Sequence, residues 1–157
     1  MIIRSALDSD KKPMSAILAQ FNLLSRSDRS SDAAYVSRHN IEHSDTVCCS
    51  VAEDSDGIVL GLQSLKRVQD GTPFGLPPGW GSIGTYVALN AVRQGIGTAL
   101  FEVSKRAARS AGVTMVDATI DDTNARGLAY YGALGFATYR TIPGFVCKCF
   151  KVTMPHK

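Results

Sequence analysis

Hydrophobic residues follow two patterns along this chain: short runs rich in β-branched residues, and longer stretches where they recur every three or four positions. The short runs predict seven strands, at 2–6, 46–52, 58–65, 83–87, 113–120, 136–140 and 144–152. The longer stretches predict four helices, at 8–24, 31–43, 96–111 and, beginning with its capping residues, 121–134.

The clearest helical pattern lies in the second half of the chain. Ile96, Leu100, Val103 and Ala107 fall at i, i+4, i+7 and i+11, which places them on one stripe of a helix. Gly112 is placed to end that helix as a C′ glycine. The pattern therefore predicts a helix that buries this stripe.

Turn residues separate the predicted strands. The segment 54–57, Asp-Ser-Asp-Gly, predicts a hairpin turn between two strands. Residues 69–81 contain three prolines and four glycines, which predicts a surface loop.

The order of these elements predicts an α/β fold. It favours a mixed, mostly antiparallel sheet of six to seven strands with helices on both faces. The chain has 157 residues, of which 45% are hydrophobic, and we expect one domain over 1–157. A domain of this length buries about 70% of its unfolded surface.

Charge and hydropathy exclude two classes of partner. The net charge is only +3, and no block of lysine and arginine is present, so nucleic acid binding is not expected. No apolar run approaches the length of a membrane span, and the N-terminus does not resemble a signal peptide. We therefore expect a cytoplasmic protein without membrane contact.

The four cysteines, Cys48, Cys49, Cys147 and Cys149, lack the Cys-x₂-Cys spacing of common metal sites. Small buried hydrophobic residues are the favoured interpretation, with a zinc site or a redox pair as the alternatives. No metal site is predicted.

A strand, a pair of glycines and a helix follow one another at 83–111. The first N–H groups of a helix have no intrahelical partner and lie at the positive end of its dipole. Gly95 and Gly97 would let a phosphate approach the backbone. The sequence therefore predicts a phosphate site at 93–98, and a tight turn without a ligand is the alternative.

Two known phosphate motifs do not fit this turn. A P-loop requires Gly-Lys-Ser/Thr, whereas Gly97 is followed by Thr98-Ala99. A dinucleotide fingerprint requires Gly or Ala at the position of Leu100. Both interpretations are disfavoured.

Two motifs resemble those of the GNAT superfamily of N-acetyltransferases. Residues 92–97, Val-Arg-Gln-Gly-Ile-Gly, resemble its acyl-CoA motif Arg/Gln-x-x-Gly-x-Gly/Ala, except that Val92 stands at the first position. Asn124, Tyr131 and the pair at 135–136, Gly-Phe, match its second motif. The resemblance covers essentially the whole chain and implies the GNAT fold.

The resemblance also implies acetyl-CoA as the acyl donor and assigns the residues that bind it. Two of them would also be catalytic: Tyr131 as the general acid for the leaving thiolate, and Val87 through a backbone N–H that polarises the carbonyl. The implied cofactor-binding residues are Val87, Ala88, Leu89, Arg93, Gln94, Gly95, Ile96, Gly97, Thr98, Asn124, Arg126 and Tyr131.

The acceptor is expected to contact the first two helices and the strand at 83–87. The candidate contacts are Phe21, Asp28, Asp32, Tyr35, Thr85, Tyr86 and Phe145. Asp28 and Asp32 could attract a cationic amine, or could simply belong to a solvated loop. The general base stays open between Glu53, Asp117 and a chain of water molecules.

The sequence thus predicts an acetyl-CoA-dependent N-acetyltransferase that acts on the primary amine of a small molecule or amino acid. The alternative is a non-catalytic module that binds or senses acyl-CoA. A dinucleotide enzyme is disfavoured by Leu100. A homodimer is possible, since the resemblance points to a family in which dimers are common.

Overall fold

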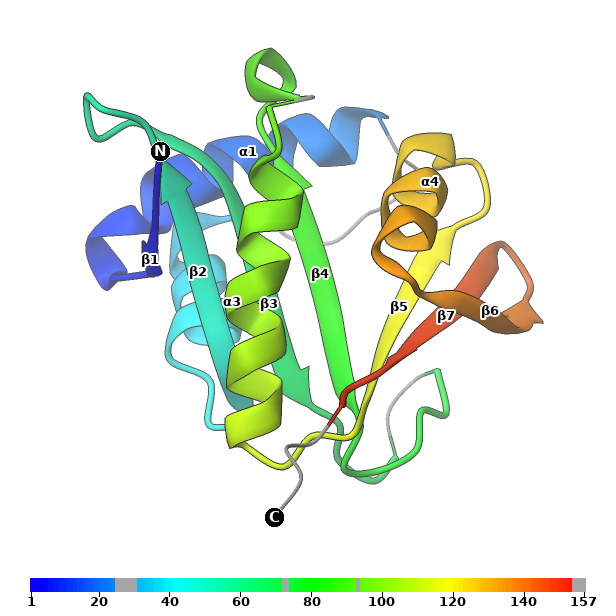
Figure 1. Ribbon diagram of the computed structural model, residues 1–157. Coiled ribbons are helices and arrows are strands. Elements are labelled where there is room, and N and C mark those ends of the chain that lie inside the picture. Colours follow the sequence, from blue (N-terminus) through cyan, green and yellow to red (C-terminus); the bar gives the residue numbers. More distant parts are fainter. Residues whose placement is uncertain (25–30, 72–73, 93, 154–157) are drawn as a thin grey trace.

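The computed structural model describes residues 1–24, 31–71, 74–92 and 94–153 (Figure 1). Its strands are β1 Ile2–Ser5, β2 Thr46–Glu53, β3 Val59–Arg67, β4 Gly81–Val87, β5 Met115–Asp121, β6 Ala137–Ile142 and β7 Phe145–Lys151. Its helices are α1 Lys11–Leu24, α2 Ala33–Val36, α3 Ile96–Ser110 and α4 Ala125–Leu134. Three short helical turns add η1 Asp8–Asp10, η2 Ser37–Ile41 and η3 Leu89–Ala91.

All seven strands form one sheet, in the order β1-β2-β3-β4-β5-β7-β6. Neighbouring strands are antiparallel except for β4 and β5, which are parallel. The prediction of a mixed, mostly antiparallel sheet is confirmed.

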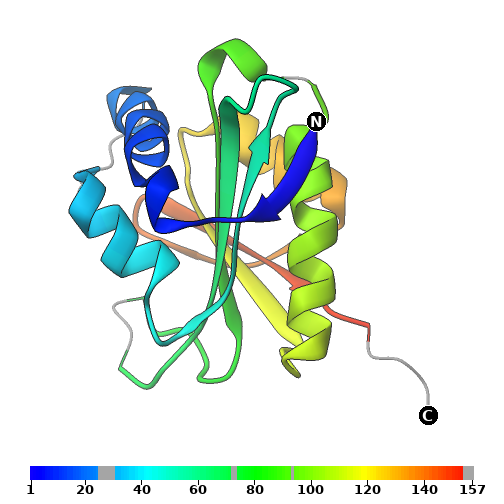
Figure 2. The same ribbon diagram turned by 90° about the vertical axis from the view of Figure 1, so that its left-hand side faces the viewer.

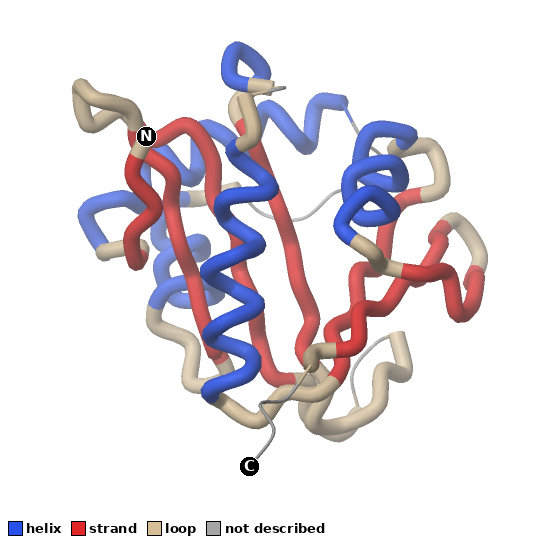
Figure 3. Tube along the Cα trace, in the orientation of Figure 1, coloured by secondary structure: helices blue, strands red, loops and turns tan. Residues whose placement is uncertain are grey.

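Helices cover both faces of this sheet. Figure 2 shows α1 and α2 on one side of the strands and α3 on the other. In Figure 3, α3 lies in front of β2 and β3. Helix α4 packs at the other end of the sheet, against β5 and β7. The predicted layering is therefore confirmed. None of the described helices is long and apolar enough to cross a membrane.

Two clusters of buried side chains fill the interior. One gathers side chains from α1, β2 and β3, and the other gathers side chains from β5, α4 and the C-terminal strands. Leu100 belongs to the first cluster and Phe101, its neighbour on α3, belongs to the second. Helix α3 therefore joins the two halves of the core.

The buried face of α3 differs from the predicted stripe. Its buried residues are Ile96, Leu100, Phe101, Ser104 and Ala108. Val103 and Ala107 are only partly buried, so the prediction was wrong for them. Phe101 is buried because α3 also packs sideways, with its ring centroid 5.4 Å from that of Phe136 and 5.1 Å from that of Phe150.

Several element boundaries also differ from the prediction. Strand β4 begins at Gly81 instead of residue 83, because Gly81 already pairs with Val116 of β5. Strand β5 begins only at Met115, since the N–H of Val113 still donates to the carbonyl of Ala108 at the end of α3. The predicted helix at 31–43 is divided between α2 and the wider turn η2.

The four cysteines occupy the sheet as free thiols. Cys49 and Cys147 are buried, and Cys48 and Cys149 are partly buried. Burial raises the pKa of the Cys49 thiol to about 12, so this side chain stays neutral as a small hydrophobic residue does.

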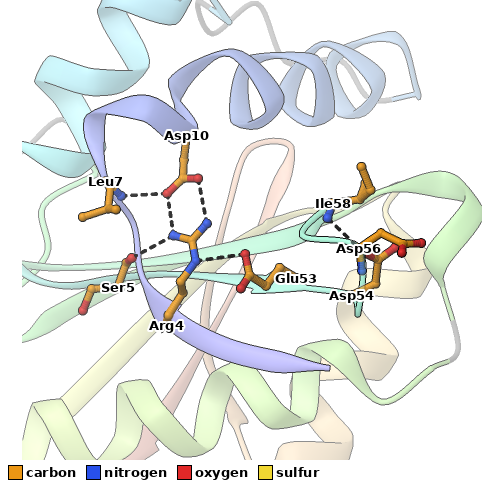
Figure 4. A network of polar contacts seen from close by, with 8 residues as sticks. All are labelled: Arg4, Ser5, Leu7, Asp10, Glu53, Asp54, Asp56 and Ile58. Carbon is orange, nitrogen blue, oxygen red and sulfur yellow. Dashed lines mark hydrogen bonds and ion pairs between the residues drawn. The ribbon is translucent and has the colours of Figure 1, made fainter.

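A polar network fixes the N-terminal edge of the sheet (Figure 4). The Arg4 guanidinium donates to both oxygens of Asp10, at 2.7 and 2.9 Å, and to a carboxylate oxygen of Glu53 at 3.1 Å. Asp10 also accepts from the N–H of Leu7. The hydrogen bonds from Arg4 hold the pKa of Asp10 below its usual range. The network therefore ties β1 and η1 to β2.

The pairing of β4 with β5 is the feature that positions the site. Only two pairs connect these strands, Gly81 with Val116 and Ser82 with Asp117. Strand β4 continues for five residues beyond Ser82 and β5 continues for four beyond Asp117, without pairing to each other. The two strands therefore diverge, and their unpaired edges face each other (Figure 1).

Candidate active site

A cleft of about 1180 Å³ lies where β4 and β5 diverge. Its walls come from β4, β5, the start of α3, α4 and the end of α1. Predicted site residues that line it are Phe21, Thr85, Tyr86, Val87, Leu89, Gly95, Ile96, Gly97, Thr98, Asn124, Arg126, Tyr131 and Phe145. The structure therefore brings most of the candidate residues together in one cavity.

The N-terminus of α3 forms one end of the cleft. Gly95 has a φ of +74° and serves as the N-cap, and its carbonyl accepts the first helical bond, from Ala99. No side chain caps this helix. A Cβ at Gly95 would meet nothing within 4 Å, and residues 95–98 all line the cleft, so a ligand in the cleft can approach the first amides. This geometry fits a diphosphate group.

Gly97 has a second reason to be glycine. A Cβ built there would lie 2.5 Å from Cε1 of Tyr130, closer than real Cβ contacts. The hydroxyl of Tyr130 donates to the carbonyl oxygen of Gly97 at 2.7 Å. Gly97 therefore lets α4 approach the first turn of α3.

The register of β4 decides which of its amides face the cleft. The N–H of Ala88 donates to the carbonyl of Leu60 on the β3 side. Because the direction of hydrogen bonding alternates along an antiparallel pair, Val87 directs its N–H and C=O away from β3. Val87 therefore offers its backbone to the gap beside β5, as the proposed carbonyl-polarising role requires.

Two predicted cofactor residues, Ala88 and Gln94, lie outside the cleft lining, and a third, Leu89, lines it with its amide already bonded. Ala88 does not line the cleft, because its amide pairs with β3. The N–H of Leu89 donates to Oε1 of Gln20, although the residue lines the cleft. Gln94 is exposed outside the lining, and Arg93 lies outside the described residues.

Asn124 and Arg126 approach the cleft from the start of α4. Asn124 is the N-cap, and its Oδ1 accepts from the N–H of Gly127 at 2.9 Å. Because the cap uses Oδ1, the Nδ2 group is the donor that Asn124 can offer to a ligand. Arg126 is exposed at the rim.

Tyr131 lies deep in the cleft, with only 7% of its surface exposed. Its hydroxyl lies 2.8 Å from Oγ1 of Thr85. Burial raises the pKa of Tyr131, and the hydrogen bond with Thr85 opposes that rise. The phenol therefore keeps its proton throughout the physiological pH range.

Sequence reasoning missed one polar residue of this site, Gln63, which reaches Tyr131 through Thr85. Gln63 is fully buried on β3, and its Nε2 donates to Thr85 Oγ1 at 2.9 Å and to Tyr130 Oη at 3.1 Å. Burial raises the pKa of Tyr130 to about 12. A glutamine among the apolar residues of 58–65 was the available signal, but its neighbours could not be read from the sequence.

Three of the predicted acceptor contacts, Phe21, Tyr86 and Phe145, give the cleft an aromatic wall. The rings of Phe21 and Tyr86 meet edge to face with centroids 5.0 Å apart, and Phe145 contacts Phe74. Tyr35 stacks on His39 and does not line the cleft.

Of the predicted acidic contacts, Asp32 does not line the cleft. The side chain of Asp32 accepts from the N–H of Tyr35 as the N-cap of α2. Asp28 lies outside the described residues.

Neither carboxylate considered as general base reaches the cleft. Glu53 pairs with Arg4 at the far edge of the sheet. Asp117 is 0% exposed, and it accepts from Tyr139 Oη at 2.6 Å and from Thr119 Oγ1 at 2.7 Å. Of the three possibilities considered for the base, a chain of water molecules is the one that these placements leave open.

The environment of Asp117 predicts a pH dependence of the stability of the fold. Burial raises its pKa, while its hydrogen bonds with Tyr139 and Thr119 oppose the rise. A carboxyl group with a raised pKa binds its proton more tightly in the folded state, so its contribution to stability is lost as pH rises through that pKa. We expect the Asp117→Asn variant to gain stability relative to the wild type as the pH rises above about 4, the pKa of an unfolded aspartate, measured by urea unfolding. Parallel pH curves for the two proteins would contradict this.

The family of the chain follows from comparison with known proteins. The model of the Acetyltransferase (GNAT) family matches residues 14–136, which include β4, the Gly95 turn, α3 and α4. The chain belongs to the GNAT acetyltransferase family. The acetyl donor of this family is acetyl-CoA, as the motifs at 92–97 and 124–136 implied. No curated protein sequence matches the chain.

Solved structures agree with this assignment at the level of the fold. The putative acetyltransferase yncA from Salmonella typhimurium, solved with its cofactor acetyl-CoA, is 20% identical, with a TM-score of 0.79 over 100% of this chain and 96% of that one. A GCN5-related N-acetyltransferase from Kribbella flavida is 20% identical, with a TM-score of 0.77 over 96% of each chain. The paia N-acetyltransferase from Thermoplasma acidophilum, in complex with coenzyme A, is 14% identical, with a TM-score of 0.74 over 96% of this chain and 98% of that one.

Proposed function

We propose that this GNAT protein transfers the acetyl group of acetyl-CoA to the primary amine of a small molecule or amino acid. The observation that carries the proposal is the placement of Tyr131 and the backbone of Val87 in one cleft with the uncapped N-terminus of α3. A donor group, a polarising amide and a proton source are the parts that acyl transfer from a thioester requires.

The start of α3 and the edge of β4 would hold the donor. The amides of Ile96, Gly97 and Thr98 have no side-chain cap and can donate to the diphosphate. Hydrogen bonds to a charged group contribute about 1.5–3 kcal/mol each. The gap-facing backbone of β4 can pair with the pantetheine arm as an added strand does, and Asn124 Nδ2 can donate to it from the other wall.

Bound acetyl-CoA supplies a thioester, whose C–S bond breaks as the amine nitrogen forms the new C–N bond. The N–H of Val87 donates to the carbonyl oxygen as negative charge develops on it. Tyr131 Oη gives its proton to the leaving sulfur, and its phenolate then regains a proton, through solvent, from the nitrogen that has formed the new C–N bond. Water takes the proton that the ammonium group loses, since neither Glu53 nor Asp117 reaches the cleft.

The direct test is release of coenzyme A across a panel of primary amines and amino acids. We expect free thiol to form only when both acetyl-CoA and an acceptable amine are present, and mass spectrometry to detect the acetylated amine. The free cysteines of the chain can add to the thiol signal, so the reaction without amine is the necessary baseline.

Other outcomes of this assay would favour other functions. Tight binding of acetyl-CoA in calorimetry, with no turnover on any amine, would favour a sensing module. Binding of NAD but not of acetyl-CoA would favour a dinucleotide enzyme. Either result would overturn the proposed function.

A further inference from the structure

The side chains of Gln63, Thr85, Tyr130 and Tyr131 meet at the wall of the cleft, and their hydrogen bonds can be assigned a direction. Tyr130 Oη lies 2.7 Å from the carbonyl oxygen of Gly97, which can only accept. The single proton of Tyr130 is therefore committed to Gly97. In its contact with Gln63, Tyr130 must accept, so the Gln63 atom facing it is the amide nitrogen.

The orientation of Gln63 then fixes its bond to Thr85. Nε2 carries two protons and accepts none, so the second proton is donated to Thr85 Oγ1 at 2.9 Å. Thr85 accepts from Gln63 and keeps its own proton for another partner. The partner in reach is Tyr131 Oη at 2.8 Å.

We infer that Gln63 and Thr85 form a one-way chain of donors that holds the Tyr131 proton toward the cleft. Thr85 donates to Tyr131 Oη, and the hydroxyl proton of Tyr131 is then left to point at the leaving sulfur. Both are positioning residues, because they act on the reaction only through Tyr131. This inference rests on the proposed role of Tyr131 as the proton donor.

The cost of burying Gln63 supports a role beyond packing. Gln63 is 0% exposed, and its Oε1 has no hydrogen-bond partner among the described residues. Leaving a buried acceptor unpaired costs about 1–3 kcal/mol, which an apolar side chain would avoid. In return, the amide nitrogen of Gln63 donates two hydrogen bonds, one to Thr85 and one to Tyr130, which an apolar side chain could not do.

The chain of donors formed by Gln63 and Thr85 would also make Tyr131 a stronger acid at the moment of proton transfer. A hydroxyl that already accepts from Thr85 keeps this bond when it becomes a phenolate, and bonds to charged oxygen are stronger. The hydrogen bond with Thr85 accordingly lowers the pKa of Tyr131 against the effect of burial.

The test compares Thr85→Val, which removes the hydroxyl at constant shape, with Thr85→Ser, which keeps it. We expect valine to lower kcat about tenfold, the effect of losing one such hydrogen bond, and serine to recover most of the rate. The KM for acetyl-CoA should change little. If Tyr131 instead donated to Thr85, valine would release its proton, and kcat would stay constant or rise, which would overturn the inference.

A second variant separates this inference from the proposed function. In a Tyr131→Phe background, Thr85→Val should cost nothing further. If Tyr131→Phe by itself leaves kcat unchanged, the proposed role of Tyr131 fails. If Tyr131→Phe lowers kcat but Thr85→Val does not, only the donor chain fails. Gln63→Met should lower kcat in the same direction as Thr85→Val, and an unchanged rate would remove Gln63 from the chain.

A measurement on the ligand-free protein checks the contact independently of turnover. The five tyrosines can be replaced by 3-fluorotyrosine, and the ¹⁹F resonance of Tyr131 assigned with Tyr131→Phe. We expect Thr85→Val to shift that resonance and Thr85→Ser to restore it. An unchanged ¹⁹F chemical shift of Tyr131 in both variants would contradict the hydrogen bond.

Discussion

Replacing Gly97 by glutamate is expected to abolish binding of coenzyme A. Gly97 lies in the first turn of α3, where the amides and the helix dipole favour an anion. A carboxylate there would occupy the same positive end and repel the diphosphate. Losing two charge-assisted hydrogen bonds corresponds to about a 10²- to 10⁴-fold loss of affinity. Isothermal titration calorimetry with coenzyme A measures this directly.

Two control variants separate charge from packing. A Cβ at Gly97 also collides with Tyr130, so the glutamate variant disturbs α4 as well. Thr98→Glu brings the same charge to an exposed neighbour that already has a Cβ, and an acidic residue in the first turn favours the helix. We expect Thr98→Glu to stay as stable as the wild type and still to weaken binding at least tenfold.

The exposed Gly132 of α4 gives the matched substitution outside the cleft. A Cβ there would meet only Lys148 Nζ, at 3.5 Å, so Gly132→Glu should bind coenzyme A as the wild type does. The diphosphate site would be wrong if acetyl-CoA raised the melting temperatures of the Gly97 and Thr98 variants as much as that of the wild type.

Tyr131→Phe is expected to lower kcat about 10²-fold, the usual contribution of a general acid, and to leave the affinity for acetyl-CoA unchanged. The ring would keep its contacts with Tyr130 and Phe136, at centroid distances of 4.8 and 5.1 Å. Loss of the hydrogen bond with Thr85 should cost about 0.5–1.5 kcal/mol of stability, so the variant should fold. Steady-state kinetics at saturating acetyl-CoA and amine, together with calorimetry, check both statements.

A neighbouring tyrosine provides the control for this change. Tyr139 lies outside the cleft lining, and its hydroxyl donates to Asp117. Tyr139→Phe should therefore leave kcat unchanged. Equal rates for the Tyr131 variant and the wild type at saturating substrates would exclude this phenol from the mechanism.

Local patterns were enough to predict most of the fold. Some elements can be predicted from their own residues, because the spacing of hydrophobic positions gives the type of element and turn or glycine residues mark its ends. Examples are the two strands beside the turn at 54–57 and the helix that starts after Gly95. The buried face of α3 was predicted incorrectly because Phe101 packs against Phe136 and Phe150, which are distant in sequence. The hydrophobic pattern of α3 alone cannot show which side chains from other elements pack beside it.

The site was predictable where single positions match a motif. Asn124 and Tyr131 were found because their spacing is fixed by one helix, and the structure places both in the cleft. Gln63 and the direction of the Ala88 amide were not found, because both depend on the register of β3 against β4. Register is a property of two strands together, and neither strand specifies it alone.

Because β4 and β5 diverge after two residue pairs, the main chain and the side chains of β4 can serve different purposes. The main-chain groups along the unpaired edge of β4 are the same for every amino acid, so they can bind the acyl donor without fixing the sequence of the strand. The side chains of β4 can then differ between proteins that bind different acceptors. A protein built this way can share its architecture with yncA at a TM-score of 0.79 while only 20% of the residues are identical.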